Sequence, residues 1–181
     1  MIDRKRRPRG LPLVTKAIYA APAFATTPVL LLMTLFMNDF YEGLGLTLSQ
    51  LFFFTAVSRT LDFVIYPCMA YITDSTRNFL GQNMGRRRPF ILSGAPFYAM
   101  LLVFLMAPPD AAAGKIRFYY GISYILFSLI STYTLLPYDS LAPELSPSPE
   151  DRDVLFALTA VAEALGSILA VAVPIGMGSY M

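Results

Sequence analysis

The sequence lacks histidine, has a single cysteine and carries few charges. Charged residues make up 14% of the 181 residues, whereas an average soluble chain has about 25%. Cys68 alone forms no intrachain disulfide, and without histidine a zinc site of the usual ligands is not expected. We expect no bound metal and no cofactor other than a coupling cation.

Two functional classes are disfavoured by further absences. There is no histidine for acid–base work, no Gly-x-Ser-x-Gly nucleophile turn and no phosphate-cradling glycine loop, so an enzyme is not expected. The formal net charge is only +2, so the overall charge of the chain does not favour binding to a nucleic acid, and we expect no such partner.

The chain is instead rich in apolar runs. It is 56% hydrophobic with a mean hydropathy of +0.56, and a membrane-spanning helix needs about 20 apolar residues. Residues 17–37, 89–109 and 118–138 are uncharged, while 48–72 carries Arg59 and Asp62 and 154–181 carries Glu163. The sequence predicts an all-α transmembrane bundle with helices at about 15–38, 48–72, 89–109, 117–138 and 154–178.

The basic residues predict the orientation of these helices, because lysine and arginine favour cytoplasmic loops. Residues 1–14 hold five basic residues, the loop at 39–47 holds none, and the next loop holds Arg77 and Arg86–Arg88. The last two loops count weakly against the same orientation. We predict a multi-pass protein of the plasma membrane with a cytoplasmic N-terminus. The first apolar run is too long for a signal peptide and lacks a cleavage site, so we expect an uncleaved first membrane helix.

Charged residues inside the predicted spans are the first candidates for function. Arg59 and Asp62 are three residues apart, so they share a helix face, and Glu163 is predicted at a similar depth. A charge at the bilayer centre costs about 2.5–3.5 kcal/mol on insertion scales. The three groups predict a polar cavity with a coupling-ion or proton site; the alternative is a structural ion pair that fixes helix register.

Several segments resemble known transporters. Asp74 near a helix end, followed by Gly-Arg-Arg-Arg-Pro-Phe-Ile at 85–91, resembles the loop between helices two and three of the major facilitator superfamily. Arg-Thr-Leu-Asp at 59–62, Tyr66-Pro67 and the segment 136–145 resemble its glycoside-pentoside-hexuronide:cation symporter family, the melibiose-permease group. The resemblance implies that residues 15–181 form about five of twelve helices, and that the missing C-terminal bundle, a small solute and the lipid bilayer are the partners.

The resemblance also implies two sets of site residues. The cavity for the coupling ion and substrate would contain Asp62, Arg59, Tyr66, Thr26 and Glu163. The cytoplasmic gate would contain Asp74, Arg77, Gly85, Arg86, Arg87, Arg88, Asp139 and Arg152.

This sequence departs from the family pattern at the cation and sugar sites. The second acid of helix two is replaced by Tyr66, the helix-one acid aligns with Thr26, the helix-four acid with Leu135 and the helix-five arginine with about Ala160. The departures favour proton coupling through Asp62, or uniport, over a sodium site of three carboxylates. Neither coupling ion, proton or sodium, is fixed by the sequence.

The function that the resemblance implies is cation-coupled symport of a sugar or similar small organic solute by alternating access. Two alternatives stay open. One is a non-transporting helical membrane scaffold or assembly subunit. The other is a lysolipid-type carrier of the same superfamily, which Pro137-Tyr138 and residues 162–166 also resemble.

Overall fold

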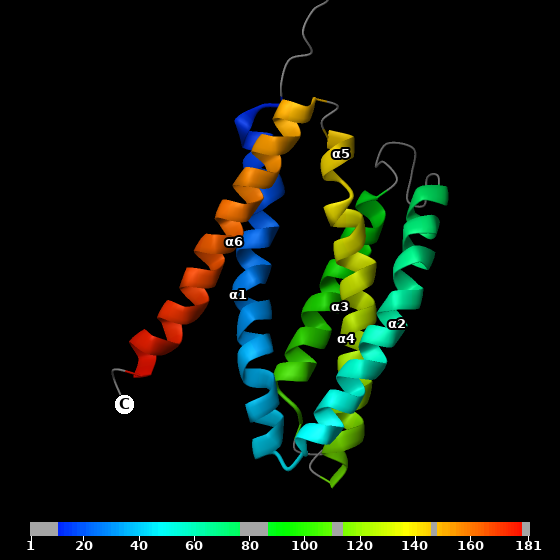
Figure 1. Cartoon of the computed structure of the whole chain (residues 1–181), viewed down its shortest axis with the longest axis vertical. Coiled ribbons are helices and arrows are strands. Elements are labelled where there is room, and N and C mark those ends of the chain that lie inside the picture. The colour runs from blue at the N-terminus through cyan, green and yellow to red at the C-terminus, as the bar shows by residue number, and fades with distance from the viewer. Residues whose placement is uncertain (1–10, 77–86, 110–113, 146–147, 179–181) are drawn as a thin grey trace, which may run out of the picture. The chain divides into compact units, whose positions relative to one another are not determined.

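The chain folds into helices. The computed structural model describes residues 11–76, 87–109, 114–145 and 148–178, and within these ranges it contains no strand. The helices, in chain order, are α1 (Leu13–Gly43), α2 (Leu48–Ser75), α3 (Arg88–Met106), α4 (Ile116–Asp139), α5 (Ala142–Leu145) and α6 (Pro149–Gly178) (Figure 1). Five helical segments of this part of the chain are long and apolar enough to cross a membrane, which confirms the predicted all-α transmembrane class.

Local chemistry explains where the helices begin and end. The helix α6 begins at Pro149, ahead of the apolar run, because proline fits the first helical turn and Glu150 and Asp151 favour the positive helix N-terminus. The helix α1 ends at Gly43, and Gly45 follows at a φ of 96°, a conformation that suits glycine.

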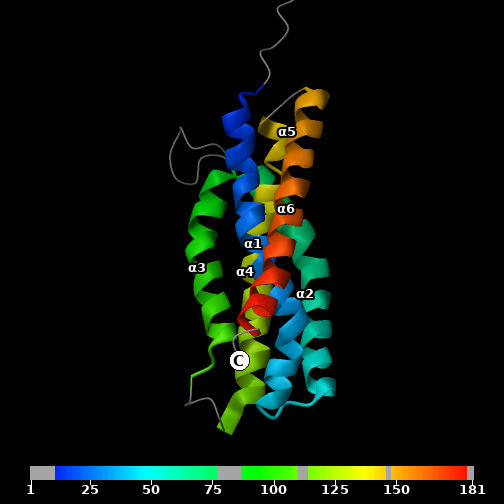
Figure 2. The same ribbon diagram turned by 90° about the vertical axis from the view of Figure 1, so that its left-hand side faces the viewer.

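The described chain divides into two compact units, one containing α1 up to Leu35 together with α5 and α6, the other spanning residues 36–141. In the second unit, α4 lies between α2 and α3 (Figure 1), and Figure 2 shows the same order after a quarter turn. The colour gradient shows that α4 runs in the direction of α2 and against α3.

Close packing holds the second unit together. The hydroxyl of Tyr41, a fully buried residue, donates to the Leu105 carbonyl at 2.8 Å, and the Tyr41 and Tyr120 rings lie 4.5 Å apart. Glycine allows a close approach of α2 to α4, because a Cβ at Gly121 would overlap the ring of Phe54. This contact fixes the position of α2 along α4, and so determines which residues of the two helices face each other further along.

In the first unit, α1 and α6 pack side by side and start at the same end (Figure 1). There the Lys16 ammonium contacts an Asp151 carboxylate oxygen at 2.6 Å, and the other Asp151 oxygen accepts the Leu11 N–H at 3.2 Å. Further along, a Cβ at Gly166 would lie 3.0 Å from the Phe24 carbonyl oxygen. The two helices therefore meet backbone to backbone.

The outer faces of the helices are apolar. Phe63 is 84% exposed, and Phe52 and Phe53 on the same helix are also exposed. Soluble monomers rarely expose contiguous apolar patches of more than a few hundred square ångströms. These faces therefore suit a lipid environment.

Candidate functional site

Asp62 is a buried carboxylate in the middle of α2. At about 1.5 Å per residue, Asp62 lies about 21 Å along the helix axis from Leu48 and about 20 Å from Ser75, the two ends of α2. Its residue exposure is 7%, although its neighbours Leu61 and Phe63 are exposed. An ionisable group at this depth is a functional candidate by default, because it is costly to bury.

Two hydroxyl groups of α4 hold this carboxylate. Ser128 Oγ lies 3.0 Å from Oδ1 and 2.9 Å from Oδ2, and Thr132 Oγ1 donates to Oδ1 at 3.2 Å. Ser128 and Thr132 are four residues apart, so they lie on the same face of α4. The Asp62 site therefore joins two helices through neutral donors.

Hydroxyl ligands suit a carboxylate that gains and loses a proton. A hydroxyl group donates one hydrogen and accepts on its lone pairs. The same Ser128 and Thr132 groups can donate to ionised Asp62 and accept a hydrogen bond from protonated Asp62. Because Ser128 has one hydrogen for two nearby oxygens, Oδ2 keeps the greater capacity for a further donor.

Arg59 approaches Asp62 but does not form a tight ion pair with it. Its Nη1 lies 3.8 Å from Asp62 Oδ2, and its side chain is 76% exposed. This separation is longer than a charge-assisted hydrogen bond, which is about 2.7–2.9 Å. Both residues belong to α2, so the pair does not join two helices, which argues against the structural-pair alternative at this position.

The other residues predicted for the cavity lie in different settings. Tyr66 is 49% exposed and is not a hydrogen-bond partner of Asp62 among the described residues. Thr26 donates to the Pro22 carbonyl of its own helix at 2.9 Å, and Glu163 is exposed in α6. Thr26 and Glu163 belong to the first unit, whereas Asp62 and Arg59 belong to the second.

At the predicted gate, the structure pairs Asp74 with Arg87. Arg87 Nη2 donates to Asp74 Oδ1 at 2.9 Å, joining the last turn of α2 to the start of α3. Arg88 and Asp139 are exposed, and Arg152 is half-buried near the start of α6. The remaining gate residues, Arg77, Gly85 and Arg86, lie outside the described residues.

The hydroxyl ligands Ser128 and Thr132 and the Lys16–Asp151 pair are not among the residues predicted from the sequence. Two hydroxyl residues four apart in an otherwise apolar span were the available signal for a polar helix face. No comparable local signal links Lys16 to Asp151, because the two residues are 135 positions apart.

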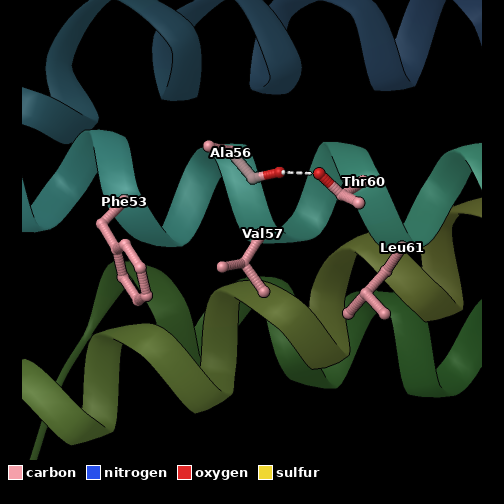
Figure 3. Close-up of a pocket in the computed structure, with 5 residues that line it drawn as sticks. All are labelled: Phe53, Ala56, Val57, Thr60 and Leu61. Carbon is pink, nitrogen blue, oxygen red and sulfur yellow. Dashed lines mark hydrogen bonds between the residues drawn. The ribbon is translucent and has the colours of Figure 1, made fainter.

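A shallow pocket of about 270 Å³ lies along α2 beside this site. Figure 3 shows its lining residues, Phe53, Ala56, Val57, Thr60 and Leu61, all from α2. Thr60 donates to the Ala56 carbonyl at 2.9 Å, so its hydrogen is already used. The pocket is apolar and does not include the Asp62 carboxylate.

Five helical segments of the described chain that are long and apolar enough to cross a membrane, one of them carrying a buried carboxylate, indicate an integral membrane protein. Residues 18–180 match the family model described as MFS/sugar transport protein, and the chain belongs to this family, within the major facilitator superfamily. The resemblance noted in the sequence is thereby confirmed.

Two curated relatives come from Escherichia coli (strain K12). The chain is 32% identical over 149 residues to the putative glycoside/cation symporter YagG, covering 82% of this chain and 31% of that protein. It is 29% identical over 124 residues to the inner membrane symporter YicJ, covering 68% and 25%.

A third relative is the sodium-dependent lysophosphatidylcholine symporter 1 of Gallus gallus, 26% identical over 117 residues, which cover 65% of this chain and 21% of that protein. The match thus spans less than a third of each of these relatives. No solved structure matches the chain.

Proposed function

We propose that this chain forms the N-terminal part of a secondary active transporter that couples a cation, the proton, to uptake of a glycoside-like small organic solute. Asp62 is the coupling acid. The relatives named as symporters support the class, and YagG, named a glycoside/cation symporter, supports the solute. The single observation that carries the proposal is the buried Asp62 carboxylate with hydroxyl ligands from a second helix.

The ligand set favours the proton over sodium. Within the part of the chain that the structure describes, Asp62 is the one carboxylate of the site, and its hydrogen-bond partners are neutral hydroxyl groups. The positions where the resemblance would place further acids hold Tyr66 and Leu135. Each of the two hydroxyl groups can donate or accept a hydrogen bond, so the same two ligands serve Asp62 in its ionised and its protonated form.

Arg59 is positioned for the solute. Its guanidinium is mostly exposed beside Asp62 and carries donors in a planar fork that can bind two oxygen atoms of one ligand. Protonation of Asp62 removes the negative charge that faces Arg59, so the two groups link cation binding to solute binding. Asp74 and Arg87 act as a latch at the cytoplasmic ends of α2 and α3.

The test uses the whole gene product in proteoliposomes, with a panel of glycosides and pentosides and with lysophosphatidylcholine. Asp62→Asn keeps the size of the side chain and one acceptor oxygen, replaces the other oxygen by an NH2 donor, and cannot ionise. We expect it to abolish solute accumulation driven by a proton gradient while retaining downhill exchange. Asp39→Asn, a matched change of an exposed acid on α1, is expected to transport like the wild type.

Other results would contradict parts of the proposal. Proton-driven accumulation by Asp62→Asn equal to wild type would remove Asp62 as the coupling acid. Transport of lysophosphatidylcholine without any glycoside would favour the lysolipid carrier. Absence of flux for every solute in the intact protein would favour a scaffold subunit.

A further inference from the structure

One side of α2 carries two residues that are exposed at membrane depth, Arg59 and Tyr66. The Arg59 side chain is 76% exposed, and Tyr66 is 49% exposed. The two residues are seven positions apart, about two helical turns, so they lie on the same side of the helix. Asp62 lies between them at the buried edge of this side, with an exposure of 7%. We name these three residues the polar face of α2.

The polar face is unsuited to contact with lipid. Arginines that border lipid extend toward the nearer end of their helix. Arg59 is nearer to Leu48 than to Ser75, the two ends of α2, yet its Nη1 extends toward the middle of the helix and lies 3.8 Å from Asp62 Oδ2. The Tyr66 hydroxyl makes no hydrogen bond within the described part of the chain, and hydrocarbon offers it no partner. The polar face therefore borders water or a polar ligand.

Phe63 marks the boundary between the polar face and the lipid-facing side of α2. It is 84% exposed, and it is turned about 100° from Asp62, because successive residues of a helix are about 100° apart. By the same rule, Tyr66 is about 40° from Asp62 and about 60° from Phe63. The Arg59 guanidinium lies on the Asp62 side of this boundary. The tyrosine ring and the guanidinium are therefore exposed to the same surroundings.

The aromatic ring and the guanidinium are within reach of one small ligand. The guanidinium lies beside the Asp62 carboxylate, and residues four apart, such as Asp62 and Tyr66, have Cβ atoms about 5–6 Å apart. The Cα–Cβ bonds of a helix tilt toward its N-terminus, which is the direction of Asp62 from Tyr66. A flat aromatic surface and a fork of hydrogen-bond donors thus lie about one helical turn apart, about 5.4 Å. A single sugar ring spans that distance.

A pyranose ring has the complementary distribution of groups. Its hydroxyl groups stand at the rim, and its C–H groups form a flat, apolar face. The face of a tyrosine ring carries the negative part of the aromatic quadrupole, which attracts polarised C–H groups. The guanidinium fork can donate to two neighbouring hydroxyl oxygens. An open-chain alditol has similar hydroxyl groups but no flat face for the aromatic ring.

We propose that Tyr66 determines the solute specificity of this protein: its ring stacks on one face of a pyranose whose hydroxyl groups bind Arg59. The inference rests on the proposed glycoside transport and adds that the solute must be a ring. It also gives a reason for the departure from the family pattern, because Tyr66 stands where the resemblance expects the second acid of a cation site. The aromatic ring at this position serves the solute, and Asp62 serves the proton.

The experiment measures uptake by the whole protein in proteoliposomes under a proton gradient. The solutes are methyl glucopyranoside, methyl galactopyranoside and methyl xylopyranoside, and the competitors are the matching alditols sorbitol, galactitol and xylitol. We expect Tyr66→Leu to raise the KM of the transported pyranoside about 10-fold, the change that the loss of one strong aromatic contact produces. Its maximal rate should stay close to that of the wild type, because a loss of uniform binding changes KM alone. Tyr66→Phe, which keeps the ring, should keep the wild-type KM.

The matched control is Tyr71→Leu. Tyr71 is a tyrosine of the same helix that is 74% exposed and turned about 140° from Tyr66, so its replacement should leave the KM unchanged. The wild type should bind the transported pyranoside more tightly than its alditol, and Tyr66→Leu should lose most of this preference.

Three results would overturn the role of Tyr66. The first is an unchanged KM in Tyr66→Leu; together with a lower Tm, it would assign Tyr66 to packing against other helices. The second is an equal weakening of pyranoside and alditol binding, and the third is a Tyr66→Phe protein as weak as Tyr66→Leu. Failure of the proposed function is a different result, because the wild type would then take up none of the pyranosides, which would overturn both.

Discussion

The Lys16–Asp151 pair offers a test of how α1 and α6 are held together. The Lys16 ammonium and the Asp151 carboxylate are 2.6 Å apart, and their side chains are only 9% and 17% exposed. Lys16→Met keeps the length and apolar stem of the lysine but removes its charge. Asp151→Asn keeps an oxygen that can accept the Leu11 N–H but removes the negative charge.

The magnitude follows from burial. Removing one partner of a buried ion pair costs about 3–5 kcal/mol, because the other charge stays in a poorly solvated place. Lys16 and Asp151 both retain some solvent contact, so we expect the lower end, about 3 kcal/mol, for each single variant. The double variant leaves no unpaired charge and should lose clearly less than the sum of the two.

Thermal unfolding of the purified whole protein in detergent provides the assay, with Lys115→Met, a change of an exposed lysine, as the control. Both single variants should lower the Tm, the control should not, and the double variant should be less than additive. An additive double variant, or single variants with the wild-type Tm, would refute the reasoning that a buried pair fixes these helices.

Two further predictions concern contacts of the second unit. Gly121→Ala should lower the Tm in detergent by the equivalent of about 1–3 kcal/mol, because the new Cβ overlaps the Phe54 ring. Adding Phe54→Ala should recover part of this loss. A Gly121→Ala protein as stable as the wild type would contradict the close packing of α2 against α4. Asp74→Arg or Arg87→Asp alone should slow solute uptake, while the two together restore part of it, since the 2.9 Å pair depends on opposite charge rather than on which helix carries it. No recovery in the exchanged pair would argue against a charge latch.

Much of the fold was predictable because it depends on local composition. A run of about 20 apolar residues must form a helix in lipid, since every backbone polar group needs an internal partner. The five helices follow from this requirement alone. The start of α6 at Pro149 was missed, because its first turn is polar and only its proline and acids indicate a helix N-terminus.

The site was predictable only in part. Asp62 stood out because a charge in an apolar span is costly, and Arg59 because it lies on the same face. Ser128 and Thr132 are ordinary residues of a membrane helix until the packing of α4 against α2 brings them to the carboxylate.

The most direct test of Asp62 as the coupling acid is the movement of protons with the solute. Proteoliposomes holding the whole protein and a pH-sensitive dye are given an inward gradient of a transported glycoside. We predict that wild type acidifies the lumen with solute entry and that Asp62→Asn admits solute without acidification. Solute entry without proton movement in the wild type, or proton movement that persists in Asp62→Asn, would contradict coupling through this carboxylate.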